Sequence, residues 1–215
     1  MVFQEFLKYV PHFSQLPLPA AEAHLKMAPE ERIQLLKNLN IEAKKPRIAA
    51  VMMLLYPKND QTHIVLIVRN SYNGVHSSQI AFPGGKYELD DLDFAYTALR
   101  ETHEEIGVLP EKIKVIRPFT PMYIPPSNFQ VHPFLGISEQ ELYFFPDPKE
   151  VADIIEWPLE QFLDDANLVE TKMTTSYASN ITVPAFQIEN QFVWGATAMI
   201  LSELKEVLKT VLNTK

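Results

Sequence analysis

The stretch from residue 82 to residue 108 constrains the fold of this chain more than any other. It combines the chain's scarcest residue with a dense acidic pattern. The chain has 215 residues but only 6 glycines, against 17 prolines, whereas an average chain of this length would carry roughly 15 glycines. Most of the glycines cluster in or near this stretch: Gly84 and Gly85 form a turn-like sequence, and Gly107 directly follows a helical pattern over residues 93–106. A glycine at that place predicts a left-handed helix cap.

Three glutamates of the predicted helix, Glu101, Glu104 and Glu105, fall within an arc of about 100°. Like charges three or four residues apart destabilise a helix, so something should compensate them. One interpretation is a solvated acidic face with Arg100 as a neighbour. The other is a site for one or two divalent cations, which take oxygen ligands and would also neutralise an anionic ligand on this acidic chain.

Short apolar runs alternate with helical patterns along the chain, which favours an α/β layered domain. Residues 48–56 and 63–68 predict a strand hairpin, because a turn-forming cluster separates them. The other predicted elements are strands at 113–119, 131–136, 183–188 and 191–194, and a closing helix over 196–211.

Residues 1–45 predict a helical extension, since prolines precede acidic helix formers twice in this segment. We expect it to pack on a main domain of residues 46–215, the alternative being an arm that binds a partner. Residues 118–133 carry five prolines and predict a stiff loop rather than a strand.

Composition excludes several classes of protein. Cysteine is absent, so there is no disulfide framework, thiolate zinc site or catalytic thiol. The net charge of −8 argues against a nucleic-acid partner, and the closely spaced Lys44, Lys45 and Arg47 fit a solvated edge. The longest apolar run, residues 48–56, is too short to cross a bilayer. With no visible secretory signal, we expect a cytoplasmic protein without a membrane partner, and the sequence leaves a homodimer open.

Residues 85–108 closely resemble the Nudix box, the signature of hydrolases that act on nucleoside diphosphates linked to another group. The box reads G, five residues, E, seven residues, then R-E-U-x-E-E-x-G-U, where U is a bulky aliphatic residue. The second half matches from Arg100 to Val108, except that Thr102 takes the first U position. The first half is one residue longer than the general form, and its acid is Asp91 or the neighbouring Asp90.

That departure itself resembles the coenzyme A pyrophosphatase-like branch of the family. Its typical Phe-Pro-Gly-Gly-Lys and Thr-Ala-Leu-Arg-Glu segments stand here at residues 82–86 and 97–101. The resemblance covers roughly residues 47–210. Upstream of the box, Arg69 and His76 fit the branch motif, whereas Gly74 stands where arginine is common and Ser78 where glycine is common.

The resemblance implies a Nudix fold, an α/β/α sandwich with a mixed β-sheet, here with an N-terminal helical extension. It implies Mg²⁺ or Mn²⁺ held by Glu101, Glu104 and Glu105, with the Gly85 carbonyl as a further ligand. We expect Arg100 to pair with Asp91 and hold the loop on the helix, because a guanidinium suits a bidentate carboxylate contact.

The remaining candidates are assigned less directly. The general base is Glu101 or, as the second choice, Glu150 in the later segment 146–151. Arg69 and Lys86 are candidate phosphate-binding residues, the alternative for Arg69 being a solvated strand end. Tyr123 and Phe129 are candidates for stacking on an adenine, with packing in the loop or core as the alternative.

The first functional hypothesis is therefore a metal-dependent hydrolase of coenzyme A or an acyl derivative, with 3′,5′-ADP and (acyl-)4′-phosphopantetheine as products. A second keeps the chemistry and changes the small-molecule substrate to ADP-ribose, NADH or another nucleoside diphosphate derivative. A third is a Nudix-fold ligand-binding module without catalysis.

Overall fold

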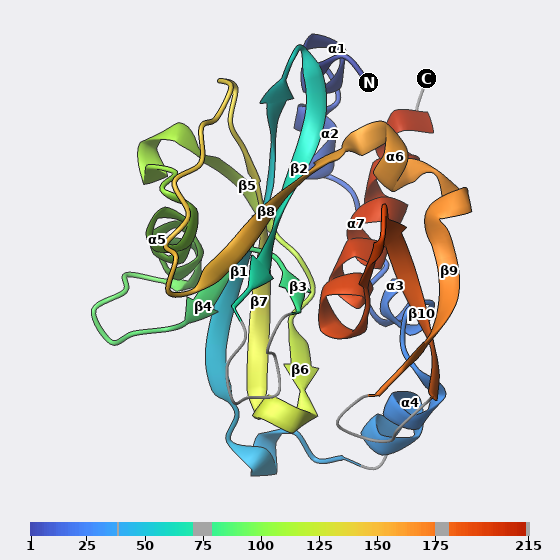
Figure 1. Ribbon diagram of the computed structural model, residues 1–215. Helices are drawn as coiled ribbons and strands as arrows, with labels where there is room; N and C mark the ends of the chain where they lie inside the picture. Colours follow the sequence, from blue (N-terminus) through green and yellow to red (C-terminus); the bar gives the residue numbers. More distant parts are fainter. Residues whose placement is uncertain (38, 71–78, 175–180, 214–215) are drawn as a thin grey trace.

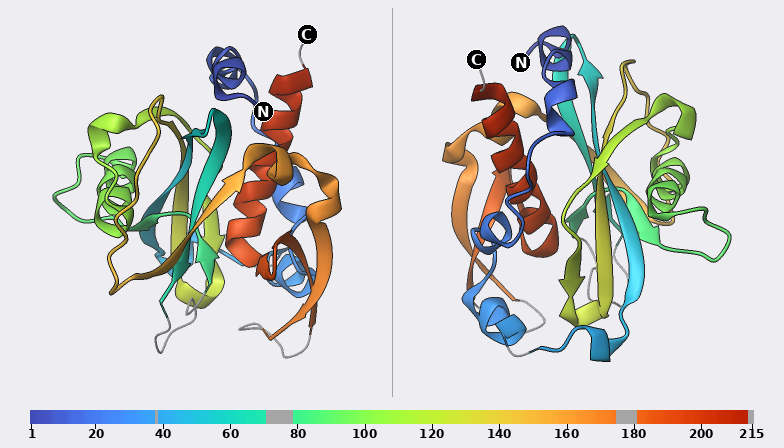
Figure 2. Two further views of the ribbon diagram at one scale, coloured as in Figure 1. Left: turned by 45° about the horizontal axis from the view of Figure 1, so that its top comes forward. Right: turned by 180° about the vertical axis from the view of Figure 1, so that it is seen from behind.

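A mixed eight-stranded β-sheet forms the centre of the protein in a computed structural model, which describes residues 1–37, 39–70, 79–174 and 181–213. Helix α5 covers one face of the sheet, and helix α7 covers the other together with the N-terminal helices (Figure 1). A small three-stranded sheet lies outside α7 (Figure 2). This arrangement confirms the α/β fold with a mixed sheet that the sequence predicts.

The helices and strands alternate along much of the chain. The helices are α1 (Phe3–Leu7), α2 (Val10–Phe13), α3 (Ala21–Leu25), α4 (Glu30–Lys37), α5 (Phe94–Ile106), α6 (Leu159–Leu163) and α7 (Gly195–Asn213), with 3₁₀ turns η1 (Glu42–Lys44), η2 (Pro110–Lys112), η3 (Pro125–Ser127) and η4 (Asp165–Asn167). The strands are β1 (Arg47–Lys58), β2 (Gln61–Arg69), β3 (Ile80–Ala81), β4 (Gly84–Lys86), β5 (Lys114–Pro118), β6 (Met122–Ile124), β7 (Phe129–Ile137), β8 (Val151–Pro158), β9 (Leu168–Met173), β10 (Ile181–Ile188) and β11 (Gln191–Val193).

Strand β1 is the central strand and explains the long apolar run of the sequence. It pairs with β7 in parallel and with β2 and β4 antiparallel. Successive side chains of a strand point to opposite faces, so a strand covered on both faces is apolar throughout. Ala49 and Met53 accordingly pack in the core beneath α7, whereas Ala50 and Met52 pack in the core beneath α5.

The N-terminal helices share the core of the main sheet. Phe3, Phe6 and Phe13 are almost fully buried, and they belong to the same cluster as the apolar face of α7. Glu203 of α7 lies buried beneath this segment, where it accepts hydrogen bonds from the Ala20 amide and the Thr120 amide and hydroxyl, and contacts the His24 ring. These hydrogen bonds outweigh the effect of burial and lower the pKa of Glu203.

The proline-rich segment corrects one prediction. Residues 118–133 contain strand β6 and the beginning of β7 in addition to the turn η3, so they are not a loop throughout. Met122 and Ile124 supply apolar side chains to the core beneath α7 while β6 pairs with β7. Pro133 fits inside β7, where its carbonyl accepts a hydrogen bond from the Phe119 amide.

None of the helices in the described part of the chain combines the length and the hydropathy that a bilayer crossing needs.

Candidate active site

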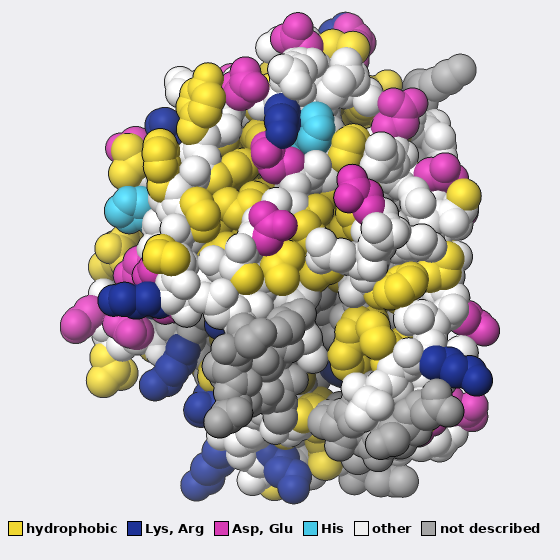
Figure 3. All heavy atoms as spheres, in the orientation of Figure 1, with side chains coloured by type: hydrophobic (Ala, Val, Ile, Leu, Met, Phe, Trp, Pro, Cys, Tyr) yellow, Lys and Arg dark blue, Asp and Glu magenta, His cyan; other side chains and the backbone are white. Residues whose placement is uncertain are grey.

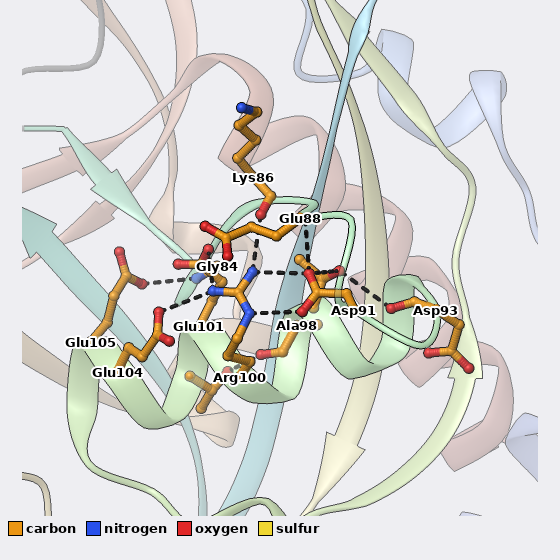
Figure 4. Close-up of polar contacts among 12 residues, drawn as sticks. Gly84, Lys86, Glu88, Asp91, Asp93, Ala98, Arg100, Glu101, Glu104 and Glu105 are labelled. Atoms are coloured by element: carbon orange, nitrogen blue, oxygen red, sulfur yellow. Dashed lines mark hydrogen bonds and ion pairs between the residues drawn. The ribbon is translucent and has the colours of Figure 1, made fainter.

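Helix α5 carries the candidate site and is fixed at both ends by its own sequence. Asp93 caps the N-terminus by accepting a hydrogen bond from the Tyr96 amide at 2.7 Å. Gly107 ends the helix in the left-handed conformation with φ 74°, as the sequence predicts. Ala98 and Ile106 are buried against the sheet. The helix therefore turns its glutamates toward β4 and the loop that follows it (Figure 4).

Gly84 is required by a close approach of backbone atoms, and Gly85 lies against the carboxylate of a neighbouring side chain. A Cβ on Gly84 would lie 2.4 Å from the Ala50 carbonyl oxygen of β1. A Cβ on Gly85 would lie 2.4 Å from the carboxyl carbon of Glu101. The Glu101 carboxylate thus occupies space that any side chain at position 85 would need, directly against the β4 backbone.

Arg100 and Asp91 form the pair that the sequence predicts. The guanidinium donates from Nε to Asp91 Oδ1 at 2.8 Å and from Nη2 to Oδ2 at 3.0 Å, a bidentate contact. The Thr97 hydroxyl and the Glu88 amide also donate to Asp91. The hydrogen bonds from Arg100 hold the pKa of the Asp91 carboxyl well below its usual range. These hydrogen bonds hold the loop between β4 and α5 against the helix.

The same guanidinium also holds two of the glutamates. Arg100 Nη1 lies 3.0 Å from both Glu101 Oε1 and Glu104 Oε2, and Nη2 donates to the Lys86 carbonyl. Burial raises the pKa of Glu101 even though Arg100 acts in the opposite direction. Glu104 is exposed to solvent. Arg100 therefore supplies positive charge to both Glu101 and Glu104.

Glu105 is the most buried of the three glutamates, with 1% of its surface exposed. Its Oε2 accepts a hydrogen bond from the Gly84 amide at 2.8 Å, and its Oε1 lies 3.2 Å from Arg69 Nη1. Burial raises the pKa of Glu105 to about 8, more than the Gly84 amide and Arg69 lower it. The Gly84 amide and the Arg69 guanidinium therefore offset only part of the effect of burial on the Glu105 carboxyl group.

The sequence matches the NUDIX domain family model over residues 46–177. Nudix hydrolase 15, a mitochondrial protein of Arabidopsis thaliana, is 34% identical over 73% of this chain and 57% of its own length. The Nudix hydrolase NudL of Enterobacter sp. strain 638 is 32% identical over 80% of this chain and 89% of its own length. The chain belongs to the Nudix family.

Solved Nudix structures share the fold. RenU of M. smegmatis superposes with a TM-score of 0.53 at 16% identity, over 77% of this chain and 87% of its own. A MutT/nudix family protein of Enterococcus faecalis gives 0.51 at 17% identity, over 92% and 81% of the two chains. As a member of the Nudix hydrolase family, the chain is a pyrophosphohydrolase that acts on phosphorus-containing anhydrides.

Nudix hydrolases generally use Mg²⁺ or Mn²⁺, and the residues of this site fit such an ion. As the side chains lie, no three acidic or histidine side chains in the described ranges converge as a metal-binding group. The donors are nevertheless all hard oxygens, as these cations prefer. The Glu101 carboxylate lies directly against the Gly85 backbone, and the Gly84 amide and Arg69 only partly offset the burial of the Glu105 carboxyl. Glu101, Glu104, Glu105 and the Gly85 carbonyl are the ligands that the sequence predicts for such an ion.

Two further candidates of the Nudix site lie next to these glutamates. Arg69 ends β2 and contacts Glu105, so it is not a free solvated tip. Glu150 is exposed, its carbonyl accepts a hydrogen bond from the Asn70 amide, and its negative charge helps to raise the pKa of Glu101 and Glu105. The structure therefore brings Glu150 near the carboxylates, although no motif marks it in the sequence.

In the described part of the chain, the three remaining candidate residues form no side-chain hydrogen bond or ion pair with these glutamates: Lys86, Tyr123 and Phe129. Lys86 follows Gly85 and its side chain is exposed. Tyr123 is 8% exposed, and its hydroxyl donates to Asn128. Phe129 packs against the core beneath α7 and is covered by the Arg47 guanidinium, 4.1 Å from its ring centre. Both aromatic rings thus have packing partners within the protein. The motif positions Gly74, His76 and Ser78 lie outside the described residues.

The buried Glu105 predicts a pH-dependent effect on stability. Between its ordinary pKa near 4.5 and about 8, the metal-free folded protein keeps the proton that the unfolded chain releases. This contribution to stability is therefore full below the lower value and is lost as pH rises toward 8. In urea unfolding with a chelator present, Glu105→Gln should gain stability relative to the wild type by about 4 kcal/mol between pH 5 and pH 9.

Glu104→Gln is the control for that experiment, because it removes a charge from the same helix at an exposed position. Its stability difference from the wild type should change less between pH 5 and pH 9 than that of Glu105→Gln. A flat difference for Glu105→Gln itself would contradict the assigned burial.

Proposed function

We propose that this Nudix hydrolase cleaves the diphosphate bond of coenzyme A or acyl-coenzyme A in the presence of Mg²⁺ or Mn²⁺. The products are 3′,5′-ADP and 4′-phosphopantetheine or its acyl derivative. The main support for the diphosphate chemistry is that the Glu101 carboxylate lies directly against the backbone of Gly85. The choice of coenzyme A rests on the sequence segments 82–86 and 97–101 and their resemblance to one branch of the family.

Each residue has a proposed role that its surroundings support. Glu101, Glu104 and Glu105 bind the ion together with the Gly85 carbonyl. When bound, the ion supplies charge neutralisation on the phosphoryl oxygens and a water of lowered pKa. Arg100 fixes the orientation of Glu101 and Glu104 through its contacts of 3.0 Å to both.

The general base is Glu101 or Glu150. Burial raises the pKa of Glu101, which makes its carboxylate a stronger proton acceptor than an ordinary glutamate. Glu150 is exposed and free to turn toward a bound substrate.

Substrate contacts are proposed for four residues. Arg69, which contacts Glu105, and Lys86, which follows Gly85 in β4, bind phosphate groups of the substrate. Tyr123 and Phe129 remain candidates for stacking on an adenine. Of the two, Phe129 is more exposed to a ligand, since Tyr123 is buried.

A second candidate substrate class is ADP-ribose, NADH or a related diphosphate. A fold neighbour, the NUDIX domain of Shewanella oneidensis NrtR, was solved in complex with ADP ribose. Its TM-score is 0.50 at 15% identity, over 82% of this chain and 97% of its own, so it supports including ADP-ribose in a substrate panel and no more.

The test is a panel of coenzyme A, ADP-ribose and NADH, incubated with the protein and Mg²⁺ or Mn²⁺ and resolved by mass. We expect coenzyme A to yield 3′,5′-ADP and 4′-phosphopantetheine at the highest kcat/KM. Turnover of ADP-ribose without turnover of coenzyme A would refute the proposed substrate. The same reaction with a chelator should show no turnover, and undiminished turnover there would refute the metal requirement.

A further inference from the structure

The last two residues at the end of β2 contact two different parts of the candidate site. Arg69 Nη1 lies 3.2 Å from Glu105 Oε1, on the helix that carries the glutamates. The next residue, Asn70, contacts the turn that carries Glu150. Its backbone amide donates to the Glu150 carbonyl at 2.9 Å, and its Nδ2 donates to the Pro148 carbonyl at 2.7 Å. The end of β2 therefore connects α5 to the turn that carries Glu150.

An irregularity in the pairing of β2 with β8 decides which residue lies opposite Asn70. The two strands keep one register as far as Val68, and the register shifts before Arg69, which lies opposite Val151. β8 therefore contributes one additional residue at this point, which is a β-bulge. The hydrogen bond from Asn70 to Glu150 continues the shifted register. Without the bulge, Val151 would take the place of Glu150 opposite Asn70.

The segment that leads into this turn lies at the surface. It follows β7 and runs along α5 to the start of β8 (Figure 1). Tyr143 and Phe145 in this segment are 74% and 72% exposed, and Figure 3 shows hydrophobic side chains along the left side of the molecule, where the segment and α5 lie. The side chains of residues 148–150 are exposed as well. Packing of these side chains therefore does not hold the turn in place.

Hydrogen bonds hold the turn instead. The Asp147 amide donates to the Glu105 carbonyl at 3.0 Å, which satisfies a carbonyl in the last turn of α5. Inside the turn, the amides of Glu150 and Val151 donate to the Asp147 carbonyl at 3.1 and 2.9 Å. Asn70 links the turn to β2 through its side-chain amide. The turn is thus joined to the helix of the glutamates at one end and to β2 at the other.

We propose that Asn70 is a positioning residue for hydrolysis, which holds the turn of Glu150 beside the glutamates of α5. In this role Asn70 acts through Glu150 and touches neither the substrate nor the metal ion. The turn brings Glu150 close enough to Glu101 and Glu105 for its negative charge to help raise their pKa. This inference rests on the proposed function and narrows its choice of general base to Glu150.

Asn70→Ala removes the side-chain hydrogen bond and keeps the backbone one. With Mg²⁺ and the panel member that the wild type hydrolyses fastest, we expect kcat to fall about tenfold and KM to stay within about twofold, because a displaced base affects the transition state more than substrate binding. Asn167→Ala is the matched control. Asn167 Nδ2 also donates to a backbone carbonyl, that of Gln161, at 2.7 Å and at an exposed place, in η4. This variant should keep the wild-type kcat.

A double-mutant cycle tests whether Asn70 acts through Glu150. Glu150→Gln should lower kcat by about a hundredfold or more, and adding Asn70→Ala to it should change kcat by less than about twofold, because the base that Asn70 positions is already lost. A further tenfold loss in the double variant would overturn the proposal, as would an Asn70→Ala protein with wild-type kcat. A Glu150→Gln protein with wild-type kcat would leave Glu101 as the base and would also overturn it.

Amide hydrogen exchange gives a measurement that does not depend on turnover. The amides of Glu150 and Val151 should exchange faster in Asn70→Ala than in the wild type and in Asn167→Ala, because the turn opens more often without its link to β2. Unchanged exchange would show that Asn70 does not hold the turn. A wild-type protein that hydrolyses no member of the panel overturns the proposed function, while the exchange measurement still decides whether Asn70 holds the turn.

Discussion

Glu104→Gln is expected to lower kcat by about a thousandfold, because the loss of one carboxylate from the proposed metal site removes several kcal/mol of transition-state stabilisation. The fold should remain intact. Glu104 is exposed and its one ion pair, with Arg100 at 3.0 Å, is of the kind that contributes about 0.5 kcal/mol or less. Steady-state hydrolysis of the best substrate, with thermal unfolding measured on the same sample, tests both statements.

Glu111→Gln is the matched control for this variant. Glu111 is an exposed acid of η2, just beyond the box helix, and carries the same charge change without a place in the proposed site. It should keep its activity. A Glu104→Gln protein with wild-type kcat would exclude Glu104 from the metal site, and a large loss of stability would mean that the activity loss reports unfolding instead.

Phe6→Ala should lower the free energy of unfolding by about 3 to 5 kcal/mol, the cost typical of removing a buried phenylalanine. Phe6 is fully buried between Phe3 and Phe13, with ring centres 6.1 and 6.0 Å away, and these rings pack in the same core as α7. Urea denaturation followed by far-UV circular dichroism measures the change. We expect a single transition, since the extension and the sheet share one core.

Leu25→Ala is the comparison for Phe6→Ala. Leu25 belongs to the same N-terminal segment, but 48% of its surface is exposed, so its truncation should cost less than about 1 kcal/mol. If Phe6→Ala cost no more than Leu25→Ala, the N-terminal helices would be an appendage that the main domain does not need.

The helix of the site could be predicted from the sequence nearly to the residue. The pattern over 93–106 matches α5, Phe94–Ile106, because Asp93 and Gly107 are strong caps. The apolar run 48–56 likewise predicts β1, because a strand that is buried on both faces carries few polar residues. Strands β8 and β9 were missed. Both mix exposed polar residues with partly buried ones, and such strands carry little signal in hydropathy.

The site could be predicted in part. The pairing of Arg100 with Asp91 follows from the chemistry of a guanidinium and a carboxylate nine residues apart in a loop–helix unit. The burial of Glu105 does not follow from its place on the helix. It depends on the Gly84 amide of β4 and on Arg69 at the end of β2, and these come together only when the sheet has formed.

The parallel pairing of β1 with β7 has a consequence for the order in which the protein folds. The residues of the box are close together in sequence, and their loop and helix can approach one another early. The central pair of the sheet beneath them forms only when β7, which begins at Phe129, pairs with β1, which begins much earlier in the sequence at Arg47. Pairings between residues so far apart in the sequence form more slowly than local contacts. During synthesis, therefore, the loop and helix of the box emerge before β7, whose pairing with β1 completes the sheet beneath them, and β8 and α7 emerge later still.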